Sequence, residues 1–155
     1  MSTDAHEPPA PGGTLAERQA RLVAALVAGG APPPGFAPAP LAAARAALLR
    51  KRAGEVARHW PLLTAALGPH WPSAFLTWAA DRPTGGGLRD GWDLARALRD
   101  RAELPPLGAE ELAVREVSLR YDGRRAPRPR RSPALAHVDG AVAIQLAGRT
   151  HLLRR

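Results

Sequence analysis

The sequence predicts a mainly α-helical protein, with a bundle-like domain of five to six helices followed by a small C-terminal β-hairpin or three-stranded sheet. Apolar residues recur at helical spacing over residues 14–119, and prolines and glycines separate the helical stretches. After residue 133, short apolar runs are separated by the turn signals Asp139-Gly140 and Ala147-Gly148, which is typical of strands. At 155 residues, the chain has room for one compact domain with a minor second element.

The N-terminal part predicts one helix between two non-helical segments. Residues 1–13 are poor in apolar groups and are expected to form a disordered leader. A helix is expected to begin at Thr14, because Glu17 three residues later completes a capping box, and to stop at Gly29-Gly30. Residues 31–40 contain five prolines, so they are expected to form a stiff connector.

Proline and capping signals divide the rest of the helical domain, which is predicted to span residues 14–119. A long helix is expected over residues 41–59, and Trp60-Pro61 is expected to break it. Further helices are expected over residues 72–80, over residues 91–101 with Asp90 as the cap, and over residues 108–119.

Three charged residues fall on faces that are otherwise apolar. Arg45 and Arg52 lie within the apolar stripe of the second helix, and Glu116 lies on the inner side of the last helix. An unpaired inward charge would cost several kcal/mol. We therefore predict a structural ion pair between Glu116 and at least one of these arginines.

The net charge of +8 is concentrated near the C-terminus. Residues 1–119 carry 13 basic and 12 acidic side chains, whereas residues 120–155 carry nine arginines and two aspartates. Residues 120–133 are predicted to be a proline- and arginine-rich linker, and residues 134–155 a small β appendage. The tail is interpreted as a solvated linker, as a surface for nucleic-acid phosphates, or as a strand edge that receives an acidic peptide. Its predicted contact residues are Arg124, Arg125, Arg128, Arg130, Arg131 and Arg149.

Catalytic and metal-binding motifs are weak in this sequence. The absence of cysteine excludes disulfides, thiolate zinc sites and a cysteine nucleophile. The five histidines lack the spacing of a helical metal site, and the sequence contains neither a nucleophile elbow nor a phosphate loop. We expect a non-enzymatic protein without a cofactor or a bound metal. Because no signal peptide or long apolar stretch is visible, a cytoplasmic location away from membranes is expected.

The sequence contains four tryptophans but only two phenylalanines and one tyrosine. Tryptophan buries a large area, so packing in the core is the simpler interpretation. Tryptophan is also enriched where proteins bind one another, so a partner-facing cluster is the alternative.

The central stretch carries a recognisable pattern. Its residues are Arg45, Leu48, the element Trp60-Pro61-Leu62-Leu63 with Leu67-Gly68, Phe75, residues 88–98, and Leu112-Ala113 with Glu116. This pattern resembles the DNA-binding-domain family found in partner proteins of multinuclear non-haem iron oxidases. Through residues 50–56 it is most similar to the C-terminal domain that some actinobacterial members of that oxidase family carry fused to the enzyme. The resemblance covers about residues 14–119, and the tail is similar to the fused version too.

The resemblance implies a subunit that binds the iron oxidase and helps to present a ribosomally made precursor peptide for modification. The metal then belongs to the partner enzyme. The alternative is a nucleic-acid-binding regulatory protein that uses the basic tail. Partner contacts are predicted at Arg50, Lys51, Trp60, Arg89 and Trp92.

Overall fold

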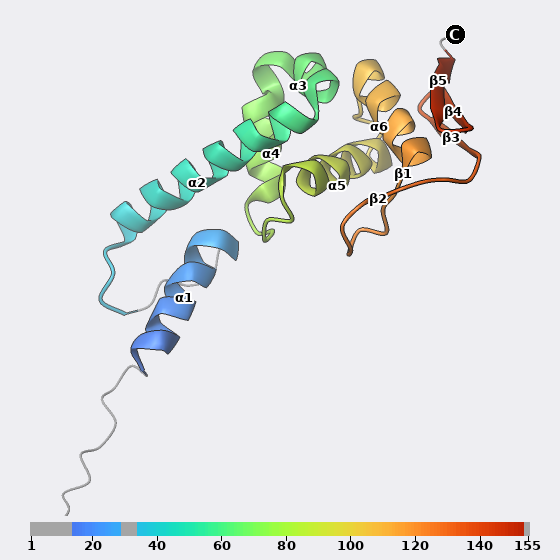
Figure 1. Ribbon diagram of the computed structural model, residues 1–155. Coiled ribbons are helices and arrows are strands. Elements are labelled where there is room, and N and C mark those ends of the chain that lie inside the picture. Colours follow the sequence, from blue (N-terminus) through green and yellow to red (C-terminus); the bar gives the residue numbers. More distant parts are fainter. Residues whose placement is uncertain (1–13, 29–33, 154–155) are drawn as a thin grey trace, which may run out of the picture.

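The structure is a computed structural model that describes residues 14–28 and 34–153. Within these residues it contains six α-helices, one short 3-10 helix and five strands, so the predicted fold class is confirmed (Figure 1). The helices are α1 (Leu15–Ala28), α2 (Pro38–His59), α3 (Pro61–Leu67), the 3-10 helix η1 (Gly68–His70), α4 (Trp71–Ala79), α5 (Gly87–Asp100) and α6 (Pro106–Ser118). The strands are β1 (Leu119–Arg120), β2 (Arg128–Pro129), β3 (Ala134–Val138), β4 (Ala141–Leu146) and β5 (Arg149–Leu153).

The elements follow one another along an elongated molecule (Figure 1). Helix α1 lies beside the N-terminal half of α2 at one end, and the sheet of β3, β4 and β5 forms the other end. Helix α6 connects the other helices to this sheet, because it contacts α3 and α5 as well as all three strands. No helix in the described ranges is both long and apolar enough to cross a lipid bilayer.

The start of α1 confirms the predicted capping box. The Thr14 amide donates to Glu17 Oε2 at 2.8 Å, and the Glu17 amide donates back to Thr14 Oγ1 at 3.3 Å. The predicted leader and the predicted stop at Gly29-Gly30 lie outside the described residues. Helix α2 begins at Pro38, three residues earlier than expected, because proline suits the first helical position.

The predicted break between α2 and α3 is also confirmed. Trp60 leaves helical geometry with φ −127° and ψ 61°, and Pro61 begins α3. Helix α3 has only seven residues, and its first turn is capped from another helix: the Leu63 amide donates to the buried carboxylate of Glu111 at 2.9 Å. The short helix is therefore held by α6.

Helix α5 begins at Gly87, four residues before the predicted start, so Asp90 is not its cap. Gly86 precedes the helix with φ 93°, a conformation that glycine adopts without strain. The Asp90 carboxylate turns back to the loop, where it accepts from the Gly85 amide at 2.7 Å and from Thr84 Oγ1 at 3.0 Å. Helix α6 begins two residues earlier than predicted and ends one residue earlier.

The C-terminal sheet has the antiparallel order β3-β4-β5, which confirms the three-stranded alternative. Val138 pairs with Ala141, and Leu146 pairs with Arg149. Both connections are two-residue turns whose residues all have positive φ, between 44° and 88°. Such turns match the twist of the two strands that they connect.

One core runs through the helices and into the sheet. All four tryptophans are buried, which confirms the core-packing interpretation, and Val138, Ala141 and Ala143 of the sheet belong to the same cluster. The rings of Trp60 and Trp92 meet edge to face with centroids 6.0 Å apart.

The segment that was expected to be an unpacked linker has structure. Strands β1 and β2 pair antiparallel, and the Arg130 amide donates to the Ser118 carbonyl at 2.8 Å. Tyr121 is buried just after β1. Proline does not prevent this pairing, because Pro129 lies in a two-stranded ribbon where an edge position tolerates a missing donor.

Candidate functional site

The predicted ion pair between Glu116 and the arginines of α2 is wrong. Arg52 pairs with Asp90 at 3.1 Å, and Glu116 pairs with Arg96 at 2.7 Å. Arg45 donates to the carbonyl of Ala80 at the end of α4. A helical wheel gives the side on which a charge lies but not the neighbour that it meets. In the fold, α2 packs against α4 and α5, whereas α6 packs against α3, α5 and the sheet.

Trp60 and Trp92, two of the predicted partner contacts, are core residues. Both side chains are fully buried. Trp60 Nε1 donates to the Leu88 carbonyl at 2.9 Å, and Trp92 Nε1 donates to Glu116 Oε1 at 2.9 Å. Because each ring is enclosed and each N–H has an internal acceptor, neither side chain is available to a partner.

The remaining predicted partner contacts lie nearer the surface. Arg50 and Lys51 are exposed on α2, and Arg89 is half-buried, with Nη2 donating to the Arg124 carbonyl at 3.0 Å. Lys51 lies at a hollow of about 170 Å³ between α1 and α2, whose apolar wall includes Leu48. An apolar floor with a charged rim is typical of protein–protein interfaces.

A polar network anchors the β1–β2 ribbon to α5. Arg96 binds Glu116, donates to the Tyr121 carbonyl at 3.2 Å, and places its guanidinium 5.6 Å from the Trp92 ring centroid. The Tyr121 hydroxyl donates to Asp93 Oδ2 at 2.8 Å. Cation–π contact and charge-assisted hydrogen bonds both stabilise this arrangement. The ribbon is therefore held in a defined place on the helical part.

Asp93 in this network gives the fold a pH dependence. Partial burial raises the pKa of Asp93, although the Tyr121 hydroxyl and Arg96 act in the opposite direction. Because the folded-state pKa lies above the unfolded one, this carboxyl adds stability below the unfolded pKa and loses that contribution as the pH rises through the folded pKa. We expect Asp93→Asn, which keeps an acceptor for Tyr121, to stabilise the fold slightly at pH 7. Urea denaturation at several pH values should show that this gain in the free energy of unfolding vanishes at about pH 3.

The predicted contact arginines of the tail fall into two groups. Arg125, Arg128 and Arg130 line a cavity of about 390 Å³ beside the β1–β2 ribbon, together with Arg120. Sequence reasoning missed Arg120, because its place depends on the β1–β2 pairing. The other predicted contacts do not line this cavity: Arg124 lies in the loop, Arg131 is exposed beyond β2, and Arg149 begins β5.

The loop of the ribbon is ordered by one aspartate. Asp122 Oδ1 accepts from the amides of Arg124 and Arg125 at 2.8 Å each. These two hydrogen bonds lower the pKa of Asp122, so its carboxylate stays ionised. The carboxylate is thus used by the backbone of the loop.

The sheet leaves an apolar face and two edges uncovered. In the part of the chain that the structure describes, β3 and β5 each pair on one side only. Leu135, Leu146 and Leu153 are more than half exposed on the side away from α6. A free strand edge beside apolar side chains can take up an extended peptide.

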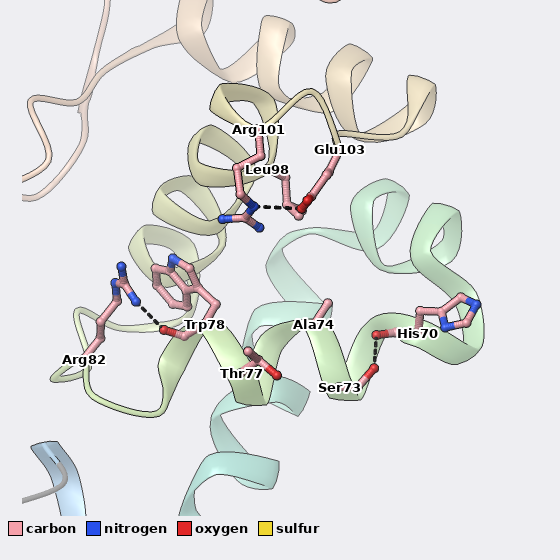
Figure 2. Close-up of a pocket in the computed structure, with 9 residues that line it drawn as sticks. All are labelled: His70, Ser73, Ala74, Thr77, Trp78, Arg82, Leu98, Arg101 and Glu103. Carbon is pink, nitrogen blue, oxygen red and sulfur yellow. Dashed lines mark hydrogen bonds and ion pairs between the residues drawn. The ribbon is translucent and has the colours of Figure 1, made fainter.

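A separate hollow of about 540 Å³ lies between α4 and the end of α5 (Figure 2). Figure 2 shows that Ser73 and Arg82 bind backbone carbonyls and that Arg101 and Glu103 bind each other. Ser73 Oγ donates to the His70 carbonyl at 2.9 Å, and Arg101 pairs with Glu103 at 2.8 Å. The serine hydroxyl is therefore directed at backbone and not at a base. Within residues 14–28 and 34–153, no group of three His, Cys, Asp or Glu could hold a metal ion.

Comparison with known proteins identifies relatives of this chain. Residues 16–100 match the family described as SCO6045-like, C-terminal domain. A UPF0276 protein of Streptomyces avermitilis is 45% identical over 132 residues, which cover 84% of this chain and 27% of the relative. The chain thus spans about a quarter of the length of this curated relative. No solved structure matches the chain.

Proposed function

We propose that this chain, which belongs to the SCO6045-like C-terminal domain family, is a non-enzymatic accessory protein of a multinuclear non-haem iron oxidase, as the resemblance of its central stretch implies. In this role it binds the enzyme and helps to recruit a ribosomally made precursor peptide. The observation that carries the proposal is the match to 27% of a UPF0276 protein. In that relative, the matching region shares one polypeptide with a much longer segment, which supports a role beside a larger partner.

The hollow between α1 and α2 is the surface that we assign to the oxidase. Lys51 and Leu48 line this hollow. Arg50 is the exposed residue next to Lys51 on α2, and Val23 exposes apolar area on α1. Apolar area in the centre supplies affinity, and charges at the rim steer the partner and fix its orientation.

Charge reversal on α2 is expected to weaken the complex with the oxidase. The Arg50→Glu, Lys51→Glu double variant should raise the Kd by about tenfold or more, because it places like charges against a surface that complements basic residues. A multinuclear non-haem iron oxidase of the proposed partner family, loaded with iron, would be titrated onto the immobilised chain. Both positions are exposed, so the thermal midpoint should stay unchanged.

A matched control uses the other end of the molecule. The Arg131→Glu, Arg149→Glu double variant changes the net charge equally at exposed positions of the tail. It should bind the oxidase like the wild-type chain. Absence of any complex would contradict the accessory role, and equal weakening by both double variants would contradict the assigned surface.

The uncovered strand edges support the recruitment of a peptide. An extended peptide that adds to β3 or β5 gains main-chain hydrogen bonds, and alternate side chains would contact Leu135 or Leu153. The main-chain hydrogen bonds do not depend on the sequence of the peptide, so the specificity comes from the side-chain contacts.

Nucleic-acid binding is the second candidate function, and the arginines beside the β1–β2 ribbon are the observation that favours it. Phosphate contacts release counterions, so such binding would weaken steeply between low and high salt. A titration of labelled DNA at two salt concentrations tests this alternative.

A further inference from the structure

Three arginines lie together on the β1–β2 ribbon. Arg120 and Arg128 are direct partners across the two strands, and Arg130 follows two residues after Arg128. Residues two apart on a strand project from the same face. All three line the cavity beside the ribbon, and Arg125 reaches the same cavity from the loop. Four arginines thus line one concave surface, and within the described ranges the Arg120 guanidinium is bound only by the Ser132 hydroxyl, to which Nη2 donates at 3.1 Å.

This arrangement is costly when the cavity holds no anion. Like charges directly opposite each other destabilise a strand pair. In addition, Arg130 Nη2 donates to the Glu116 carbonyl at 3.3 Å, but Arg130 Nε is buried and makes no hydrogen bond, and no carboxylate in the described part of the chain neutralises this guanidinium. A fold that keeps these features gains from an anion that enters between the guanidinium groups.

The two acidic residues of the cavity do not supply that anion. Glu116 is bound by Arg96 and Trp92, and Asp122 accepts from two backbone amides of its own loop. Among the described residues, no carboxylate lies within ion-pair distance of the guanidinium groups that line the cavity. These groups belong to Arg120, Arg125, Arg128 and Arg130.

We propose that this cavity binds the carboxylate side chains of an acidic peptide segment, with Arg120 and Arg128 gripping one carboxylate between the two strands. Guanidinium groups bind carboxylates through paired, charge-assisted hydrogen bonds. The inference rests on the proposed function, because the precursor peptide is the expected source of the segment. It adds a second place of contact, apart from the edges of β3 and β5, and the acidic character of the peptide.

The shape of the site favours a peptide over a nucleic acid. A cavity of about 390 Å³ accommodates one or two side chains, whereas single-stranded nucleic acid needs an extended basic track with exposed aromatic rings. The aromatic side chain at this cavity is Tyr121, which is buried, and its hydroxyl is bound to Asp93. A stacking surface is therefore not offered at this place.

Fluorescence anisotropy on the full chain tests the site. The probe is a fluorescein-labelled peptide of about ten residues that alternates glutamate and serine, long enough for one extended binding segment. A second peptide carries glutamine in place of glutamate, and a third probe is oligothymidylate of equal length. The test variant is Arg120→Gln, Arg128→Gln, and the control is Arg18→Gln, Arg58→Gln, which removes two charges from exposed helical positions.

We expect the glutamate peptide to bind, the glutamine peptide not to bind, and the Arg120, Arg128 double variant to lose about tenfold or more in affinity. The control variant should bind like the wild-type chain. Without peptide, the double variant should melt at the same temperature or higher, because a like-charge pair has been removed. A purely structural role for these arginines would lower the midpoint instead.

Three results would overturn the site: equal binding by the double variant and the control, equal binding of both peptides, or tighter binding of oligothymidylate than of the glutamate peptide. The last result would assign the cavity to nucleic acid. The oxidase titration is independent of this assay. Peptide binding without an oxidase complex would retain the acidic-peptide site and remove the proposed enzyme partner.

Discussion

Gly91→Ala is expected to destabilise the fold by about 1–3 kcal/mol, the usual cost of overpacking a rigid core. A Cβ atom at residue 91 would overlap Cδ1 and Nε1 of Trp60 and would lie 2.7 Å from Cγ. The Trp60 ring cannot move away easily, because it is fully buried and donates to the Leu88 carbonyl. The contact between α5 and the end of α2 therefore requires a residue without a side chain.

Gly54→Ala is the matched control, because it makes the same substitution inside another helix. Residue 54 is exposed on α2, and an added Cβ would meet nothing within 4 Å. Alanine is the better helix former, so this variant should gain about 0.5–1 kcal/mol. Chemical denaturation of both variants measures the two changes. A Gly91→Ala protein as stable as the wild type would show that the Trp60 ring is not held as described.

Asp90→Ala is expected to cost about 3–5 kcal/mol, the usual range for breaking one side of a buried ion pair. Asp90 is 3% exposed, and its carboxylate binds Arg52, Thr84 Oγ1 and the Gly85 amide. Its loss leaves the guanidinium of Arg52 without its carboxylate, in a place where the side chain is only 11% exposed. The loop before α5 loses two hydrogen bonds in the same step.

Asp100→Ala provides the exposed comparison. Asp100 pairs with Arg99 at 2.8 Å, but its side chain is 65% exposed. Water replaces such a partner easily, so the loss should stay below about 1 kcal/mol. Thermal or urea unfolding of the two alanine variants gives the difference directly. Similar losses at both positions would contradict the structural importance of the Arg52–Asp90 pair.

Features that depend on a few neighbouring residues could be predicted from the sequence. The capping box of Thr14 and Glu17, the break at Trp60-Pro61 and the two hairpin turns all have local causes. The start of α5 could not be predicted in the same way. Asp90 resembles a cap in the sequence, but tertiary contacts with Arg52 and Thr84 use its carboxylate instead.

The partners of the inward charges could not be predicted, because they depend on how helices cross. Glu116 pairs with Arg96 of α5, although the helical wheels of α2 and α6 predict Arg45 or Arg52 as its partner. Trp60 shows the same limit: composition marks tryptophan both for cores and for interfaces, and only its enclosure decides between them.

The sequence predicts part of the candidate site, the arginine-lined cavity beside the β1–β2 ribbon. The excess of arginine in the tail follows from composition, and Arg125, Arg128 and Arg130 were predicted as contact residues. Their convergence with Arg120 was not visible, because it needs the pairing of β1 with β2 across a loop of seven residues. Two-residue strands carry almost no periodic signal. The identity of the partners stays a prediction.

The position of α6 has a practical meaning for anyone who shortens this chain. The family match ends at residue 100, with the last residue of α5, so a fragment cut there would lack α6. Such a fragment would lose the Glu111 carboxylate that accepts from the Leu63 amide at the start of α3. It would also expose one side of the Trp60–Trp92 pair to water. The part of the chain that the family model matches is therefore shorter than the unit that shares one core in the structure.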